Sequence, residues 1–261
     1  MFNIVRSHVL WLAVALFPVV VAIAQGQDST LLLLLLSSFL VFLNRGRERS
    51  AGFLIALALF KPHLILPIAA VLIWRRGYGF LQGFLAGSTA VLLLSTGITG
   101  VHGWLQMKEL WRYAVSGTSG QIGVNSASMP NLRGMMWTLG FGAHTALVLS
   151  VVLSALLFAV VAWRLRSQRS PEILFPPLMA LTLLLSTYVN AHDLAILIIP
   201  VLAMLVAEKK SMLICAGTCF SLPLFLYLGH AALFFFVICF VLCLTVRNAK
   251  AETAAKEVAV G

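Results

Sequence analysis

Long apolar runs, separated by short polar segments, dominate this chain. A helix that crosses a membrane needs roughly 17 to 25 mostly apolar residues, and shorter runs form half-membrane or buried segments. Read between charges and turn residues, the runs are His8–Ala24, Ser29–Leu43, Ser50–Trp74, Tyr78–Ile98, Ala143–Trp163, Ile173–Tyr188, Leu194–Ala207, Met212–Leu228 and Ala231–Val246. This pattern predicts an all-α, polytopic transmembrane helical bundle with about eight full spans.

The run Ser50–Trp74 differs from the others because Lys61-Pro62-His63 interrupts it and basic residues flank it at both ends. A single spanning helix would place these two basic clusters on opposite sides of the membrane. Proline lacks a backbone donor and disfavours helix at the residue before it. We therefore predict a half-membrane hairpin of two short helices, Ser50–Phe60 and Leu64–Trp74, that turns at Lys61-Pro62.

The composition supports a membrane protein and excludes a water-soluble domain. Hydrophobic residues make up 61% of the 261 residues and charged residues only 10%, whereas soluble chains carry about a quarter charged residues. The net charge of +10 predicts no nucleic-acid partner, because the basic residues fall in loops that the positive-inside rule places in the cytoplasm. The expected location is the plasma (inner) membrane, with many passes and both termini cytoplasmic. On this topology, 14 of the 18 Lys and Arg residues are cytoplasmic: Arg6, Arg45, Arg47, Arg49, Arg75, Arg76, Arg164, Arg166, Arg169, Lys209, Lys210, Arg247, Lys250 and Lys256.

The chain is expected to form one transmembrane domain over residues 1–247, followed by a short cytoplasmic tail at 248–261. The longest segment between spans is an outer loop at 99–142, whose first part, Val101–Val115, is typical of a short helix lying in the membrane interface. The four cysteines form two sets of two, each with the helical spacing i, i+4, and both sets lie inside apolar runs. Thiols in such surroundings usually act as small hydrophobic groups.

Lys61 is the first candidate for chemistry, because a lysine inside an apolar run is costly unless it faces a cavity or an opposite charge. At the tip of the hairpin, beside His63, it could meet a lipid-linked phosphate as a compact cation. The alternative is an anchoring lysine whose ammonium extends to the outer membrane interface.

Three further groups lie on the predicted outer side. The neighbours His192 and Asp193 could supply acid–base chemistry or orient a sugar hydroxyl, and Asp28 could act as a base. Both aspartates also stand where they could cap a following helix, starting at Leu194 or at Ser29. Arg133 could bind a phosphate with two parallel hydrogen bonds or form a structural salt bridge.

The sequence contains no Gly-rich phosphate loop, no Asp-x-Asp, no cluster of metal ligands and no Gly-x-Ser-x-Gly elbow. We therefore expect no cofactor and no metal. From the residues alone, the prediction is a polytopic membrane protein with an outward-facing polar pocket for an anionic lipid head group.

A series of short motifs runs along nearly the whole chain. The motifs are Phe17-Pro18, Gln25-Gly26-Gln27, Arg45-Gly46-Arg47 with Ala51-Gly52, Leu59-Phe60-Lys61-Pro62-His63, Trp74-Arg75-Arg76, Met129-Pro130-Asn131-Leu132-Arg133-Gly134, and His192-Asp193 before Pro200. In their order and spacing, these motifs resemble glycosyltransferase family 87, within the GT-C superfamily.

The resemblance implies a GT-C-like membrane hexosyltransferase, such as a mannosyltransferase, that uses a polyprenyl-phosphate sugar on the extracytoplasmic face. Its partners would be the lipid-linked sugar donor, a glycolipid or glycan acceptor, and membrane lipids. Lys61, His63 and Arg133 would bind the donor phosphate. His192 would lie in the active-site cleft, with Asp28 or Asp193 as substitutes for the family's catalytic carboxylate.

The chain departs from the family pattern at its start, because no residue matches the general-base Asp that family members carry in their first outer loop. We therefore expect a chain that lacks the N-terminal part, has an N-terminal partner chain or is an inactive relative, and is inactive or nearly so on its own. The alternatives are a transporter or flippase of lipid-linked sugars and a non-catalytic membrane subunit.

Overall fold

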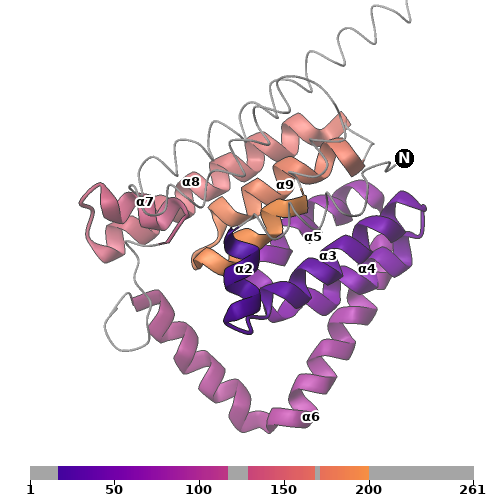
Figure 1. Ribbon diagram of the computed structural model, residues 1–261, viewed down its shortest axis with the longest axis horizontal. Coiled ribbons are helices and arrows are strands. Elements are labelled where there is room, and N and C mark those ends of the chain that lie inside the picture. The colour runs from indigo at the N-terminus through magenta and orange to yellow at the C-terminus, as the bar shows by residue number, and fades with distance from the viewer. Residues whose placement is uncertain (1–16, 117–128, 168–170, 200–261) are drawn as a thin grey trace, which may run out of the picture.

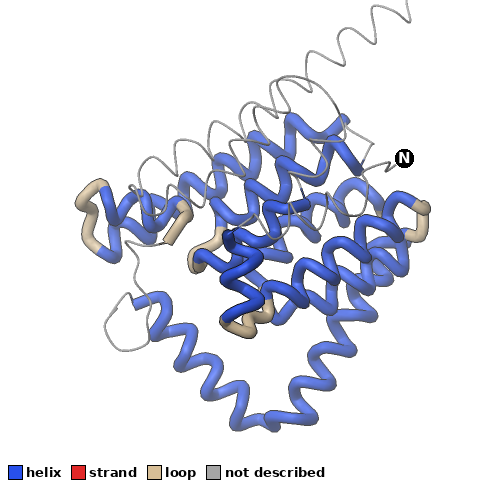
Figure 2. The backbone as a smooth tube through the Cα atoms, viewed as in Figure 1, coloured by secondary structure: helices blue, strands red, loops and turns tan. Residues whose placement is uncertain are grey.

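The computed structural model describes residues 17–116, 129–167 and 171–199, and all regular structure within them is helical. The α-helices are α2 (Phe17–Ala24), α3 (Ser29–Asn44), α4 (Glu48–Leu57), α5 (Pro62–Arg76), α6 (Tyr78–Ser116), α7 (Leu132–Thr138), α8 (Ala143–Arg164) and α9 (Pro171–Leu185). Three short 3-10 helices, η1 (Ala58–Phe60), η3 (Leu165–Ser167) and η4 (Ala191–Leu197), join or extend them. The predicted all-helical fold is confirmed for this part of the chain (Figures 1 and 2).

Two of these helices are long and apolar enough to cross a membrane. They are α8 and the stretch Tyr78–Leu110 of α6, and only 22% and 6% of their most apolar windows are buried inside the molecule. Apolar helices that remain this exposed need an apolar solvent, which a bilayer provides. The predicted count of about eight spans is not confirmed, and Met212–Leu228 and Ala231–Val246 lie outside the described residues.

The predicted pair of helices with a turn at Lys61-Pro62 is present, while its half-membrane location stays a prediction. Helix α4 and η1 lead to Lys61, where the backbone leaves the helical region (φ −119°, ψ 69°), and α5 begins at Pro62. Arg76 Nη1, at the end of α5, lies 3.9 Å from Glu48 Oε1, at the start of α4. The two helices therefore double back on each other, with their basic ends together and Lys61 at the far end.

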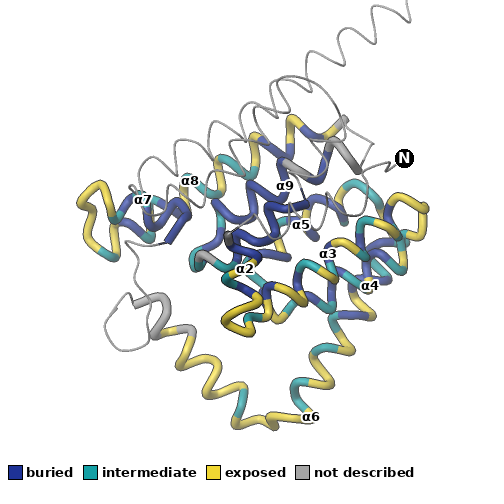
Figure 3. Tube along the Cα trace, in the orientation of Figure 1, coloured by how far each residue is buried: buried dark blue, intermediate teal, exposed yellow. Residues whose placement is uncertain are grey.

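The buried core forms where α3, α5 and α9 meet. Phe39 of α3 packs against Phe175 of α9 and Phe80 of α6, at ring-centroid distances of 5.2 and 6.4 Å. One face of α5, from Leu64 to Leu72, is also buried, as the dark segments of Figure 3 show. This core fixes the two ends of α5 and thereby the position of Lys61.

Helix α6 bends sharply at Gly100, where φ is 63° and ψ is −173°. This positive φ is a conformation that glycine adopts without steric cost. The bend divides α6 into two arms that form a V away from the rest of the molecule (Figure 1). The second arm covers the predicted separate helix Val101–Val115, while its location in the membrane interface stays a prediction.

Helix α9 ends at Leu185, three residues before the predicted end of its apolar run. Ser186 Oγ accepts a hydrogen bond from the Tyr188 backbone N–H at 3.2 Å and donates one to the Tyr188 carbonyl at 2.6 Å. Such local side-chain bonds offer the backbone an alternative to helical pairing. The segment from Ser186 to Asn190 is therefore non-helical, and it leads to η4.

Candidate active site

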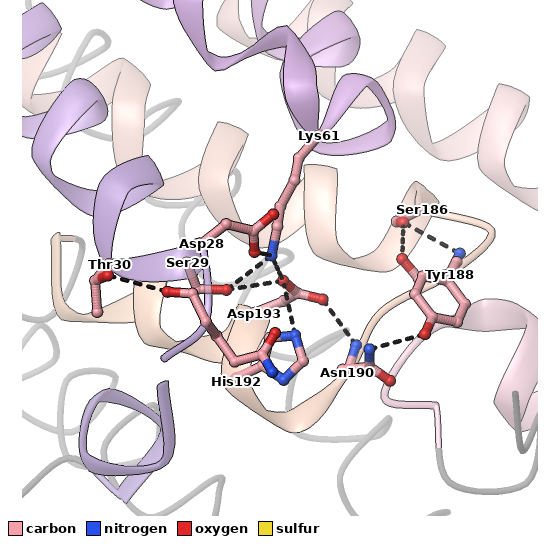
Figure 4. A network of polar contacts seen from close by, with 10 residues as sticks. Asp28, Ser29, Thr30, Lys61, Ser186, Tyr188, Asn190, His192 and Asp193 are labelled. Carbon is pink, nitrogen blue, oxygen red and sulfur yellow. Dashed lines mark hydrogen bonds and ion pairs between the residues drawn. The ribbon is translucent and has the colours of Figure 1, made fainter. Parts of the chain in front are cut away.

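Three segments that are distant in the sequence meet around the ammonium group of Lys61 (Figure 4). Lys61 Nζ lies 2.7 Å from Asp28 Oδ1 and 2.5 Å from Asp193 Oδ1, and it donates a hydrogen bond to Ser29 Oγ at 2.8 Å. Only 8% of the Lys61 side chain is exposed. We refer to Asp28, Ser29, Lys61 and Asp193 as the lysine cluster.

The lysine cluster joins the α2–α3 turn, the tip of the hairpin and the start of η4. Ser29 also donates a hydrogen bond to Asp193 Oδ1 at 3.1 Å, so the hydroxyl bridges the ammonium and one carboxylate. Every polar atom of Ser29 and Lys61 that points into the cluster therefore has a charged or hydroxyl partner. A buried charge is tolerated when it is paired and hydrogen-bonded in this way.

The two carboxylates differ in exposure and in what else they bind. The Asp28 side chain is 49% exposed and the Asp193 side chain only 2%. Asp193 Oδ2 accepts a hydrogen bond from the Asn190 backbone N–H at 2.9 Å, so both of its oxygens are occupied. Asp28 is therefore the more accessible of the two carboxylates.

The two aspartates differ in the helix-capping role that the sequence offered as an alternative. Asp28 occupies the N-cap position of α3 but makes no side-chain capping bond, because its carboxylate binds Lys61. The helix near Asp193 begins at Ala191, not Leu194, and Asp193 stabilises its start from the third helical position, because its side chain accepts the Asn190 backbone N–H in a capping box. The capping alternative therefore holds for Asp193, at a different helix start, and does not hold for Asp28.

The lysine cluster combines one ammonium group with two carboxylate groups. The Lys61 ammonium is thus already paired, and any further anion has to compete with a carboxylate for it. The exposed Asp28 is the partner that can move away without burying an unpaired charge.

His192 lies beside the lysine cluster, with Nε2 3.8 Å from Asp193 Oδ1. Burial lowers the pKa of its imidazole from the ordinary value of 6.5, and the Asp193 carboxylate opposes this shift. Because desolvation is the larger of the two effects, His192 is neutral at pH 7 and can accept a hydrogen bond or a proton.

The lowered pKa of His192 predicts a pH dependence of stability. Below pH 6.5 the unfolded chain binds a proton at this position more readily than the folded chain, so stability should fall as the pH drops. We expect His192→Gln to lose less stability than wild type between pH 7 and pH 5. The check is to measure the unfolding midpoints of wild type and His192→Gln in the same detergent between pH 7 and pH 5. If the two midpoints change with pH in parallel, the lowered pKa of His192 is contradicted.

His63 follows the hairpin tip, in the first turn of α5. Its ring stands edge-on to Tyr188 at a centroid distance of 6.4 Å. Its Nε2 is buried, and none of the described residues forms a hydrogen bond with it. A buried imidazole nitrogen without a protein partner, two residues from Lys61, is a position where a ligand oxygen can bind.

The motif Met129–Gly134 packs against the segment that follows α9. Asn131 caps α7 by accepting a hydrogen bond from the Gly134 N–H at 2.8 Å, and its amide donates to the Ser186 carbonyl at 2.9 Å. Arg133 is buried, and its Nη1 lies 3.5 Å from the Thr187 carbonyl. The structure thus places Arg133 next to the segment that leads to His192 and Asp193.

Three polar residues of the site, Ser29, Asn190 and Asn131, are not among those predicted from the sequence. Asn190 lies in the same short polar stretch as His192, and Asn131 precedes Arg133 in a motif already singled out, so proximity was a usable signal for both. Ser29 had no comparable signal, because it begins an apolar run. Asn190 also donates a hydrogen bond to the Tyr188 hydroxyl at 3.0 Å, which orders the segment before Asp193.

No metal site is built among the described residues, since no three His, Cys, Asp or Glu side chains group together in a way that could hold an ion. The lysine cluster offers instead an ammonium, one accessible carboxylate and a hydroxyl, and the imidazoles of His63 and His192 lie beside it. These groups can bind an oxyanion and accept a proton from a hydroxyl.

Comparison with known proteins gives one match. The profile of glycosyltransferase family 87 matches residues 3–187, a range that includes Asp28, Lys61, His63 and Arg133 but ends before His192 and Asp193. No curated protein and no solved structure matches the chain. Because the match covers more than half of the sequence and agrees with the apolar, exposed helices, the chain belongs to glycosyltransferase family 87, a family of membrane enzymes that transfer a sugar from a donor to an acceptor.

Proposed function

We propose that this protein is a hexosyltransferase, and specifically a mannosyltransferase, whose donor is a polyprenyl-phosphate-linked sugar on the extracytoplasmic face. The family assignment supports glycosyl transfer. The observation that carries the proposal further is the lysine cluster, in which a buried ammonium and an accessible carboxylate are in direct contact. The predicted cytoplasmic location of the basic ends of the hairpin supports the outer side for Lys61, at its other end.

In the proposed reaction the donor phosphate takes the place of Asp28 on the Lys61 ammonium. His63 Nε2 donates a hydrogen bond to the same phosphate, and Arg133 is the second cation proposed for it. As the bond between the anomeric carbon and the phosphate oxygen breaks, the phosphate leaves with the electron pair. Lys61 stabilises the charge that develops on that oxygen, and polyprenyl phosphate is the product.

The acceptor is proposed to be a sugar hydroxyl of a glycolipid or glycan. Its oxygen attacks the anomeric carbon on the opposite face, and its proton passes to Asp28. Asp28 is assigned as the base because it is half exposed, whereas Asp193 is buried and held by Asn190 and Lys61. In this scheme Asp193 fixes the position of Lys61, and His192 orients the acceptor hydroxyl.

The decisive experiment is sugar transfer by the purified chain in lipid from a radiolabelled polyprenyl-phosphate donor. We expect Asp28→Asn to reduce the transfer rate about a hundred- to ten-thousand-fold, the usual contribution of a positioned base. Glu109→Gln is the matched control, since Glu109 is an exposed acid paired with Arg112 on the second arm of α6. Equal rates for wild type and Asp28→Asn would remove Asp28 from the reaction.

The same variant tests whether phosphate and Asp28 compete for Lys61. Asp28→Asn removes one negative charge from the lysine cluster, so a polyprenyl-phosphate analogue should bind on the order of tenfold more tightly while transfer is lost. Replacing a residue that only maintained the fold would not strengthen binding of the analogue while it abolished transfer. If wild type binds the analogue but transfers no sugar, the chain acts as a non-catalytic subunit, the alternative considered from the sequence.

A further inference from the structure

A second polar site lies at the opposite end of the hairpin from Lys61. A groove of about 610 Å³ opens between α3, α4 and α6, beside the start of α4. Helix α4 alone separates the two ends by roughly 15 Å, at 1.5 Å per residue. The groove is therefore distinct from the lysine cluster. Its lining residues are Phe42, Arg49, Ser50, Phe53, Leu54, Gln82, Gly83 and Ala86.

The lining has one polar edge and one apolar wall. Arg49, Ser50 and Gln82 provide a guanidinium, a hydroxyl and an amide, which are all groups that can donate hydrogen bonds to a phosphate. Phe42, Phe53 and Leu54 form the apolar wall. A ligand that fits this lining has an anionic, hydrogen-bond-accepting head and a hydrocarbon tail.

The charge at this end of the bundle is not compensated by neighbouring acids. Arg45, Arg47 and Arg49 are exposed, and within the described part of the chain none of them forms an ion pair with a carboxylate. The guanidinium of Arg47 instead lies over the ring of Phe42, 5.9 Å from its centroid. The nearest acid, Glu48, contacts Arg76. This excess of positive charge favours an anionic ligand.

The surroundings of the groove favour a lipid over a soluble anion. Exposed apolar side chains continue beyond it on the same helices, including Val41 on α3 and Leu85 on α6. In a family of membrane enzymes these faces contact acyl chains. Clusters of Arg and Lys beside spanning helices attract anionic head groups, each residue adding about 1 kcal/mol.

We propose that this groove binds one anionic phospholipid, with its phosphate at Arg49, Ser50 and Gln82 and an acyl chain along Phe42, Phe53 and Leu54. The bound lipid holds α3 against α4 and α6 at the base of the hairpin. This inference requires a membrane location but does not depend on the donor or the reaction proposed for the lysine cluster.

The test is lipid binding by the delipidated, full-length protein in detergent, measured by native mass spectrometry. Phosphatidylglycerol and phosphatidylcholine with identical acyl chains are compared, and a polyprenyl phosphate is the third ligand. We expect wild type to prefer phosphatidylglycerol, and Arg49→Gln to weaken its binding about fivefold. Arg166→Gln, which removes one charge from an exposed arginine that stacks on Trp163, should leave this binding unchanged.

Three results would overturn the proposal. Equal binding of phosphatidylcholine would show that charge is not recognised, and equal losses in Arg49→Gln and Arg166→Gln would show only a diffuse attraction. Binding of polyprenyl phosphate that Arg49→Gln weakens more than it weakens phosphatidylglycerol would assign the groove to the carrier lipid. Arg49→Lys, which retains the charge, should retain most of the binding, and lipid-free unfolding midpoints confirm that the variants remain folded.

Discussion

Replacing Lys61 with Met is expected to lower the free energy of unfolding by about 3–5 kcal/mol, the usual cost of removing one partner from a buried ion pair. The substitution leaves Asp193, whose side chain is 2% exposed, without its cation. Adding Asp193→Asn in the same chain should recover most of this loss, because no buried charge then remains unpaired. The double-mutant cycle separates the ion pair from the packing of the lysine stem.

Unfolding midpoints of the single and double variants, measured by the same heating protocol in one detergent, provide the check. Arg112→Met is the reference, because Arg112 and Glu109 form an exposed pair, with side chains 71% and 67% exposed. Such surface pairs contribute at most about 1 kcal/mol. If Lys61→Met destabilises the protein no more than Arg112→Met, the lysine cluster does not exist as described.

This result also limits what Lys61→Met can say about the donor. A loss of donor binding in that variant could come from a missing phosphate contact or from a displaced Asp193. Asp28→Asn avoids the problem, because Asp28 is half exposed and its loss leaves Lys61 paired with Asp193. The opposite changes expected in binding and transfer for Asp28→Asn are therefore the better test of the donor site.

The hairpin and its turn at Lys61 could be predicted from the sequence because the signals are local. A charge within an apolar run is unfavourable in a single spanning helix, and the following proline removes a helical hydrogen bond. Likewise, the apolar run that ends at Ile98 predicted that a separate helix follows. The bend at Gly100 creates this second helical arm of α6. The family resemblance is confirmed by the match over residues 3–187.

The lysine cluster itself could not be predicted, because Asp28 and Asp193 are 165 positions apart and only the packing of α3, η4 and the hairpin brings them to one ammonium. Local rules favoured helix capping for Asp28. In the structure its carboxylate binds Lys61 and makes no capping bond. Similarly, Arg133 is buried beside the Thr187 carbonyl, a position that depends on how α7 packs against the segment after α9.

Close packing between α4 and α6 leads to the second large effect. On α6 the residues Gly79, Gly83 and Gly87 recur every four positions, a spacing that lets membrane helices approach closely. A Cβ atom added at Gly83 would lie 1.9 Å from the Arg49 carbonyl oxygen, and one at Gly87 would lie 2.7 Å from the Phe53 carbonyl oxygen. The backbones are therefore in direct contact over about one helical turn, from Gly83 to Gly87.

We expect Gly83→Ala to destabilise the protein by about 3 kcal/mol, the upper range for overpacking a well-packed contact. The new methyl group meets backbone, which cannot rotate away as a side chain can, so α4 has to move by about 1.5 Å to restore van der Waals contact. Gly97→Ala on the same helix is the control, since a Cβ there meets nothing within 4 Å. There, alanine should be neutral or stabilising by up to about 1 kcal/mol.

Unfolding midpoints and size-exclusion profiles of the two variants in detergent distinguish these outcomes, and equal midpoints would contradict the close approach. The displacement of α4 should also change the geometry of the lysine cluster, because α4 continues through η1 directly into Lys61. A shift of α4 moves the ammonium relative to Asp28 and Asp193, whose distances of 2.7 and 2.5 Å leave little tolerance. Folded Gly83→Ala protein should therefore transfer sugar more slowly than Gly97→Ala, although Gly83 contacts no reacting group.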